Sequence, residues 1–221
     1  MDLMEAIQKR HSVRQYKDIP IEKEIVDELI SEIRAINKEA GLNFQLVLNE
    51  PKAFSGFMAH YGNFSGVSNY FALVGKKSPD LEEKCGYFGE RLVLKAQQLG
   101  LHTCWVALTY SKVPNAFKIE KGEKLTVVIS VGHGRNHGLV RRSKSIEEVS
   151  NVTDSSPDWF KRGVEAALLA PTAINQQKFY LSQNGTKVSA RALMGPCSKM
   201  DLGIVKYHFE VGAGKENFEW E

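Results

Sequence analysis

Long apolar runs are absent from this sequence of 221 residues. The most apolar stretch, Leu125 to Val131, is interrupted within about ten residues, whereas a helix that crosses a membrane needs about 20. The segment from Met1 to Arg10 alternates acidic, apolar and basic residues without a continuous apolar core, so no secretory signal is expected. These absences predict a cytoplasmic protein with no membrane partner.

Cysteine and net charge are also low. The three cysteines, Cys85, Cys104 and Cys197, are odd in number and lack C-x-x-C spacing, which argues against a disulfide framework or a zinc site. The 29 basic and 26 acidic residues give a net charge of +3, too small to indicate a nucleic-acid partner. The composition, 43% hydrophobic and 25% charged, is typical of a globular chain.

Basic residues gather in one ten-residue stretch. They are Arg135, His137, Arg141, Arg142 and Lys144. A solvated loop beside a sheet edge explains this stretch better than a nucleic-acid surface, because no aromatic residues are interleaved with it. His133 and His137 have no carboxylate at ligand spacing, so no metal site is expected.

The apolar pattern predicts a chain of mixed helices and strands. Apolar residues spaced by three and four indicate helices, and short apolar runs indicate strands. The expected helices cover residues 2–9, 21–37, 80–99, 158–169 and 201–211. The expected strands cover residues 44–48, 70–74, 104–108, 125–131, 179–182 and a short segment near 188. The polar stretch 144–157 is expected to be a linker.

A near-repeat relates two parts of the sequence. A shift of 135 residues places Leu29 on Val164 and Phe44 on Phe179, and a shift of 112 relates the helices at 80–99 and 201–211. Helix, strand and helix thus occur twice in one order, which favours two copies of one plan over chance matching. The expectation is a single unit, 1–221, with pseudo-repeat halves of about 1–150 and 155–221.

Two motifs carry the candidate chemistry. The first, Arg10-His11-Ser12-Val13-Arg14-Gln15-Tyr16, has two guanidiniums and a hydroxyl that suit a phosphate. The residues alone leave another interpretation open, in which Arg10 interacts with a helix C-terminus and Arg14 is solvated. The second motif, Ala170-Pro171-Thr172-Ala173-Ile174-Asn175-Gln176-Gln177, follows a helix that Pro171 ends. The residue types alone leave open that Thr172 and Asn175 are only turn residues.

These motifs resemble those of the FMN-dependent nitroreductase family. The first resembles the family's flavin-phosphate signature and the second its Pro-Ser/Thr-small-x-Asn-x-Gln loop. The segments 99–106 and 125–134 resemble the end of its central helix with the following strand, and the end of its core. The resemblance implies an α+β fold, a three-layer αβα sandwich with a mixed, mainly antiparallel central sheet and an internal pseudo-two-fold repeat.

The order of the motifs departs from the family. Ordinary members carry the Pro-Ser loop about thirty residues after the Arg-x-Ser segment, and two chains of a homodimer build each site. The corresponding residues here, 35–41, lack the proline and serine. The sequence therefore resembles a subgroup with a fused, pseudo-dimeric chain, expected to be a monomer or weak homodimer. Ala107 and Leu108 also stand where the family has a Gly-Gly context near flavin N5.

The resemblance implies an oxidoreductase with FMN as cofactor and NADH or NADPH as co-substrate. Hydride would pass through flavin N5 to an electron-poor small molecule, a nitroaromatic or quinone, and no catalytic side chain is expected. The expected cofactor-binding residues are Arg10, His11, Ser12, Arg14, Ala107, Leu108, Arg141, Arg142, Pro171, Thr172, Ala173, Asn175 and Gln176. A second hypothesis is a non-catalytic FMN-binding module for sensing or storage.

Overall fold

The computed structural model describes residues 1–140 and 142–221. The chain divides into two compact units, each assembled from segments that are far apart in the sequence. Met1–Lys9, Glu82–Arg91 and Arg141–Glu221 form one, here named the three-stranded unit after its sheet. Arg10–Leu81 and Leu92–Val140 form the other, the four-stranded unit. In the part of the chain that is described, no helix has the length and apolar character to cross a membrane.

The sheet of the four-stranded unit is antiparallel throughout. Its strands are β1 (Gln45–Val47), β2 (Tyr70–Lys76), β3 (His102–Val106) and β4 (Glu123–Gly132), in the order β1-β2-β4-β3. The central position of β4 agrees with its run of branched apolar residues, which favours a strand buried on both faces. β3 is the edge strand beside which the first motif lies.

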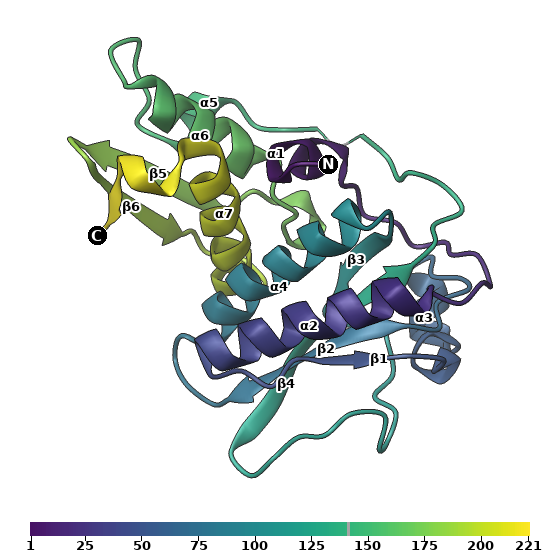
Figure 1. The fold of residues 1–221 in the computed structure, drawn as a ribbon. Coiled ribbons are helices and arrows are strands. Elements are labelled where there is room, and N and C mark those ends of the chain that lie inside the picture. The colour runs from purple at the N-terminus through teal and green to yellow at the C-terminus, as the bar shows by residue number, and fades with distance from the viewer. Residues whose placement is uncertain (141) are drawn as a thin grey trace. The chain divides into compact units, whose positions relative to one another are not determined.

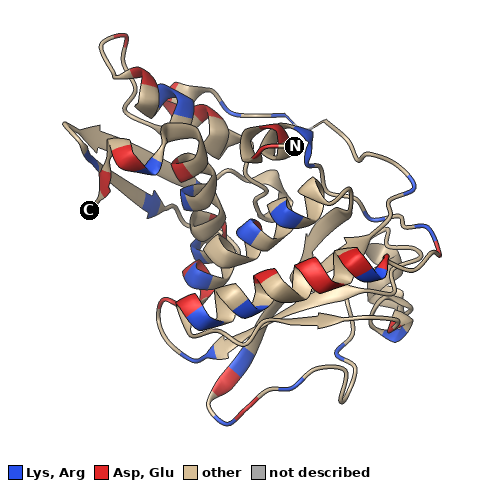
Figure 2. Cartoon of the chain, viewed as in Figure 1, with Lys and Arg blue, Asp and Glu red and all other residues tan. Residues whose placement is uncertain are grey.

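Two long helices belong to this part of the fold. α2 (Lys23–Ala40) buries a stripe formed by Leu29, Ile33 and Ile36, while acidic and basic residues cover its visible side (Figure 2). The later part of α4 (Leu81–Gln98) runs beside α2 (Figure 1), and the Lys95 Nζ lies 2.5 Å from a Glu28 carboxylate oxygen. α2 ends at Gly41, whose φ of 65° suits glycine best.

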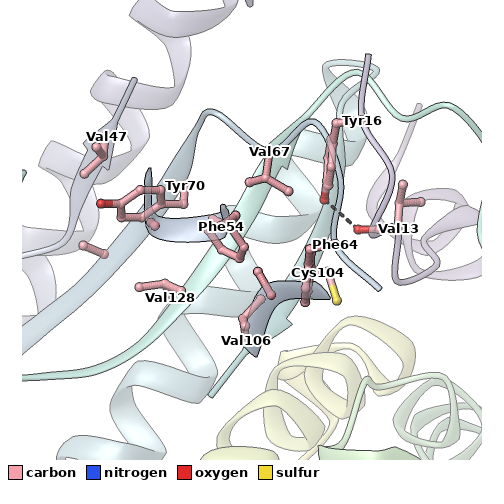
Figure 3. Close-up of a cluster of buried hydrophobic side chains, with 13 residues drawn as sticks. Val13, Tyr16, Val47, Phe54, Phe64, Val67, Tyr70, Cys104, Val106 and Val128 are labelled. Atoms are coloured by element: carbon pink, nitrogen blue, oxygen red, sulfur yellow. Dashed lines mark hydrogen bonds between the residues drawn. The ribbon is translucent and has the colours of Figure 1, made fainter. Parts of the chain in front are cut away.

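An aromatic cluster covers one face of the sheet. Phe54, from the 3-10 helix η1 (Pro51–Phe54), lies between Tyr70 and Phe64 with ring centroids 5.9 and 5.2 Å away (Figure 3). The short helix α3 (Phe57–Tyr61) follows η1 and contributes the buried Ala59 to the same cluster. This cluster fixes the loops that connect β1 to β2 against the sheet.

The three-stranded unit combines helices with a smaller sheet. Its helices are α1 (Leu3–Lys9), the first part of α4, α5 (Ile146–Val149), α6 (Asp158–Leu168), η2 (Ala173–Asn175), α7 (Ser198–Ala213) and η3 (Lys215–Asn217). Its strands are β5 (Phe179–Asn184), β6 (Lys187–Ala192) and β7 (Glu219–Trp220). β5 pairs antiparallel with β6, and β7 pairs parallel with β6.

Two glycines let α4 and α7 cross with their backbones in contact. A Cβ atom on Gly86 would lie 2.0 Å from the Met200 carbonyl oxygen, and one on Gly203 would lie 2.0 Å from the Glu83 carbonyl oxygen. The contact is reciprocal, because each glycine meets the residue three positions before the other. Only residues without a side chain permit this approach. Pairing Gly86 with Gly203 relates the two helices by a shift five residues longer than the 112 that the near-repeat in the sequence gives. The internal repeat itself stays a prediction.

A buried ion pair joins the same two helices. His208 on α7 and Glu90 on α4 are both fully buried, and His208 Nε2 lies 2.9 Å from Glu90 Oε1. The other ring nitrogen, Nδ1, lies 3.1 Å from the Ala166 carbonyl oxygen on α6. The ring therefore connects α7 to both α4 and α6 through groups that are fully shielded from water.

The expected helices and strands are present, and four differences from them stand out. The strand expected at 104–108 is β3, which ends at Val106 because its pairing with β4 ends at Val128. The expected linker contains α5, whose start is stabilised by a hydrogen bond from the Ser145 N–H to Glu148 Oε2 at 2.8 Å. The short α3 and the two-residue β7 were not expected from the sequence, because each is too short to show a period.

Candidate functional site

The first motif lies along the edge of β3 in the four-stranded unit. Ser12 forms a parallel bridge with Thr103, and the Val13 N–H donates to the Thr103 carbonyl at 3.0 Å. On the other side, the Arg14 carbonyl accepts a hydrogen bond of 3.0 Å from the Ser65 N–H. Because backbone bonds hold the segment from both sides, the motif is an ordered extension of the sheet.

The charged side chains of this motif gather near Cys104 on β3. Burial raises the pKa of the Cys104 thiol, while Arg14, the Ser12 hydroxyl and Arg10 lower it. These three groups therefore lie within electrostatic reach of Cys104. Arg10 is only 1% exposed, whereas Arg14 is exposed. A buried guanidinium is rare and is stable only where acceptors or an anion compensate for its lost hydration.

His11 lies against a glycine of the loop that follows β4. A Cβ on Gly138 would lie 2.6 Å from the His11 Cβ and 3.0 Å from the Ser12 carbonyl oxygen. The φ of Gly138, 76°, is also one that side chains rarely adopt. Gly138 thus allows this loop to cover the first motif.

His102, the first residue of β3, pairs with His137 of this loop. His102 Nε2 and His137 Nδ1 are 3.5 Å apart, and the Gly134 N–H donates to His102 Nδ1 at 3.2 Å. Burial, with His137, His133 and Lys17, lowers the pKa of His102, which favours the neutral ring. Over residues 1–140 and 142–221, no three metal-ligating side chains converge.

Ala107 and Leu108 lie in the loop directly after β3. Both are exposed, and Leu108 is 79% exposed. Their backbone is therefore outside the sheet, not within a strand of 104–108. The next loop residues pack beside α3, since a Cβ on Gly62 would lie 2.8 Å from the Thr109 side chain.

The second motif forms a tight loop in the three-stranded unit. Pro171 is buried at the end of α6, and residues 173–175 make the single turn η2. Ile174, Asn175 and Gln177 have φ values of 48, 56 and 46°, in the left-handed region. For Ile174, which is branched at Cβ and 89% exposed, this conformation is strained. Strain of this kind is often found at functional sites.

Asp201, in the first turn of α7, holds this loop. Its carboxylate accepts the Ala173 N–H at 3.0 and 3.1 Å and the Gln176 Nε2 at 2.7 Å. Burial raises the pKa of Asp201 to about 6, against the opposing effect of these two hydrogen bonds. Sequence reasoning missed this residue, because an aspartate in a first helical turn is ordinarily explained by the helix dipole.

The amide donors of the loop are engaged within the unit. Asn175 Nδ2 donates to the Arg142 carbonyl at 2.8 Å, and Gln176 Nε2 also donates to the Pro196 carbonyl at 2.7 Å. The Thr172 hydroxyl accepts the Gln177 N–H at 3.0 Å. Gln176 Oε1 differs, since it is buried and has no hydrogen-bond partner among the described residues. It faces Gly195, where an added Cβ would lie 2.4 Å from this oxygen.

The sequence of this chain matches a known protein family. A family model described as "Putative TM nitroreductase" matches residues 2–213. The chain belongs to this nitroreductase family. No curated protein matches this member of the family in sequence.

Solved structures place this nitroreductase-family chain in a known fold. A protein from Thermotoga maritima, described as a putative nitroreductase, aligns with a TM-score of 0.72 and 23% identity, covering 98% of this chain and 85% of that one. A putative nitroreductase in complex with FMN from Desulfovibrio desulfuricans aligns with a TM-score of 0.54 and 17% identity, covering 71% and 99%. The NfrA1 nitroreductase from B. subtilis aligns with a TM-score of 0.54 and 13% identity, covering 70% and 74%. These likenesses confirm the expected α+β nitroreductase fold.

The expected cofactor residues of this nitroreductase-family chain fall into two groups. The four-stranded unit holds Arg10, His11, Ser12, Arg14, Ala107 and Leu108. The three-stranded unit holds Arg142, Pro171, Thr172, Ala173, Asn175 and Gln176. Arg142 contributes its carbonyl to the loop, while its side chain is exposed. Arg141 lies outside the described residues.

Proposed function

We propose that this chain is an FMN-dependent oxidoreductase that takes hydride from NADH or NADPH and reduces an electron-poor small molecule, a nitroaromatic or quinone. The gathering of Arg10, Ser12 and Arg14 around Cys104 on β3 carries the proposal. Two guanidiniums and a hydroxyl are the donors that suit a phosphate of almost two negative charges. The FMN complex of a protein with the same fold supports the same cofactor here.

The loop of residues 171–177, in the three-stranded unit, is a second candidate flavin contact. Its backbone is held in a fixed strained shape by hydrogen bonds to Asp201. We propose that this loop binds the ribityl chain or the ring edge, and that Arg10, Ser12 and Arg14 bind the phosphate.

When bound, FMN would supply hydride transfer at its N5 atom. The residues of this chain then bind and orient it and provide positive charge. No side-chain acid or base is needed for that step, which agrees with a site built from arginines, a hydroxyl and amides. We further propose a cytoplasmic monomer or weak homodimer that acts on small molecules, with no nucleic-acid or membrane partner.

Replacing Arg10 with alanine is expected to weaken FMN binding by at least tenfold. The reason is the loss of a charge-assisted contact to the phosphate, worth about 1.5 to 3 kcal/mol. The dissociation constant would be measured by quenching of flavin fluorescence, with the exposed Arg34 on α2 replaced by alanine as a matched control. Arg10→Lys, which keeps the charge, tests for effects of folding. Equal FMN occupancy in folded Arg10→Ala and Arg34→Ala proteins would contradict the phosphate assignment.

Anaerobic NADH or NADPH is expected to bleach the flavin absorbance of the purified protein. Addition of a quinone should restore the yellow colour and allow continued oxidation of the nucleotide. Spectra recorded under nitrogen before and after each addition measure both steps. A flavin that remains yellow with either nucleotide would favour the non-catalytic FMN-binding module, for which the exposed Leu108 in place of a Gly-Gly context is the motivating feature.

A further inference from the structure

We propose that Asp201 is a positioning residue, whose buried carboxylate holds the loop of residues 172–177 in the shape that binds flavin. The inference rests on the proposed function, because it takes that loop as a flavin contact. Asp201 itself reaches the loop from α7, about 25 residues further along the chain. It acts through the loop and would not touch the cofactor.

The hydrogen bonds show how one carboxylate controls the loop. An ionised carboxylate can only accept hydrogen bonds. The Asp201 carboxylate accepts two, one from the Ala173 N–H at the start of the η2 turn and one from Gln176 Nε2 directly after it. Ile174 and Asn175, both left-handed, lie between these two contact points. The carboxylate thus closes the turn across its strained residues and offsets a conformation that side chains disfavour.

The same contact orients the Gln176 side chain. Its Nε2 donates to both Asp201 Oδ2 and the Pro196 carbonyl, and these two acceptors fix which end of the amide carries the nitrogen. The oxygen, Oε1, consequently faces Gly195, which has no side chain to displace it. Asp201 therefore sets both the backbone of the loop and the direction of its buried acceptor.

The position of Asp201 is fixed by the helix crossing. Met200, its neighbour in sequence, has its carbonyl oxygen against Gly86 of α4. The Asp201 N–H donates to the Cys197 carbonyl at 2.9 Å at the start of α7. The carboxylate is held on a packed helix and is only 5% exposed, so it is a rigid support for the loop.

Protonation of Asp201 should weaken its hold on the loop without lowering the stability of the folded chain. Its folded pKa, about 6, is above the ordinary value of 3.8, because burial disfavours the charged form. Protonation between pH 6 and 4 therefore removes a cost of folding, and this group does not destabilise the folded chain there. The same proton weakens an acceptor that two loop donors need. The Cys197 thiol faces both Asp201 and Glu82, and burial together with these two charges raises its pKa.

The experiment measures riboflavin and FMN binding between pH 5 and 8. Riboflavin has no phosphate, so the phosphate's own titration near pH 6 does not enter its profile. We expect wild-type affinity for riboflavin to fall about tenfold as the pH drops through 6, the loss of one charge-assisted contact. Asp201→Asn should bind about tenfold more weakly at pH 8 and show a flat profile. Asp201→Glu, which restores a carboxylate, should regain part of the affinity and the pH dependence.

Glu210→Gln is the matched control, since Glu210 is a second buried carboxylate on α7 that contacts Tyr87 and Trp220 instead of the loop. It should keep the wild-type profile. Hydrogen exchange in the cofactor-free protein gives a second readout, because the Ala173 amide should exchange faster in Asp201→Asn and in the wild type at pH 5, after correction for intrinsic rates. This wild-type comparison still applies if Asp201→Asn fails to fold.

Two failures are distinguishable. A wild-type protein that binds neither FMN nor riboflavin overturns the proposed function and this inference with it. A wild-type protein that binds flavin with the same affinity and pH profile as folded Asp201→Asn overturns the inference alone. Unchanged exchange of the Ala173 amide between pH 8 and 5 has the same meaning.

Discussion

Replacement of His208 by leucine is expected to lower the free energy of unfolding by about 3 to 5 kcal/mol. The change removes the histidine that contacts Glu90, whose carboxylate would remain fully buried in α4. It also leaves the Ala166 carbonyl without the donor it has at 3.1 Å. Urea unfolding followed by tryptophan fluorescence would measure the loss, because Trp159 and Trp220 lie in the same unit.

The double variant Glu90→Leu/His208→Leu distinguishes the effect of leaving Glu90 without His208 from the effect of replacing the histidine ring by leucine. With both side chains replaced, the buried carboxylate is removed together with its histidine partner, so the double variant should be more stable than His208→Leu alone. The exposed His60 replaced by leucine is the control for the substitution itself and should change stability by less than about 0.5 kcal/mol. A double variant less stable than the single one would contradict the ion-pair interpretation.

Gly203→Ala is expected to cost about 3 kcal/mol, or to lower the melting temperature by roughly 6 to 12 °C. The added Cβ would meet the Glu83 carbonyl oxygen at 2.0 Å and the Tyr87 nitrogen at 2.7 Å. Both atoms belong to the backbone of α4, so no rotamer change relieves the contact and the helices must separate. Thermal unfolding followed by circular dichroism measures the shift.

The reciprocal contact makes this prediction sharper. Gly86→Ala should have a similar cost, and the double variant should cost less than the sum, since one separation of the helices accommodates both Cβ atoms. Gly185→Ala, where the new atom meets nothing within 4 Å, should cost only about 1 kcal/mol from its positive φ. Strictly additive effects of the two helix variants would refute the shared crossing point.

The sequence predicted elements that have a strong local pattern. α4 shows apolar residues at helical spacing and β4 a branched apolar run, and both lie within two residues of the expected bounds. α5 also has a local signal, since Ser145 and Glu148 have the spacing of a capping box. The short elements α3 and β7 depend on tertiary contacts instead of periodicity.

The motifs of the candidate site can be recognised in the sequence, whereas the residue that holds the second motif in place cannot. Arg10, Ser12 and Arg14 are recognisable because their residue types and spacing suit a phosphate. Asp201 acts on a loop about 25 residues away, and nothing in a single sequence relates the two. Asn175 and Gln176 are expected cofactor-binding residues, and the folded loop uses their side-chain nitrogens in internal hydrogen bonds. Pairings across such distances are set by the packing of α7.

The discontinuity of the three-stranded unit has a consequence for the nascent chain. Residues of the four-stranded unit have all been synthesised once Val140 is added, but α1 and the first part of α4 wait for the C-terminal segment. Glu90 meets His208 only after 118 more residues have been added. At typical elongation rates this interval lasts about 6 to 24 s, with the glycine-bearing side of α4 still without its partner helix. Ribosome-bound chains that end before α7 should therefore be the ones that chaperones engage.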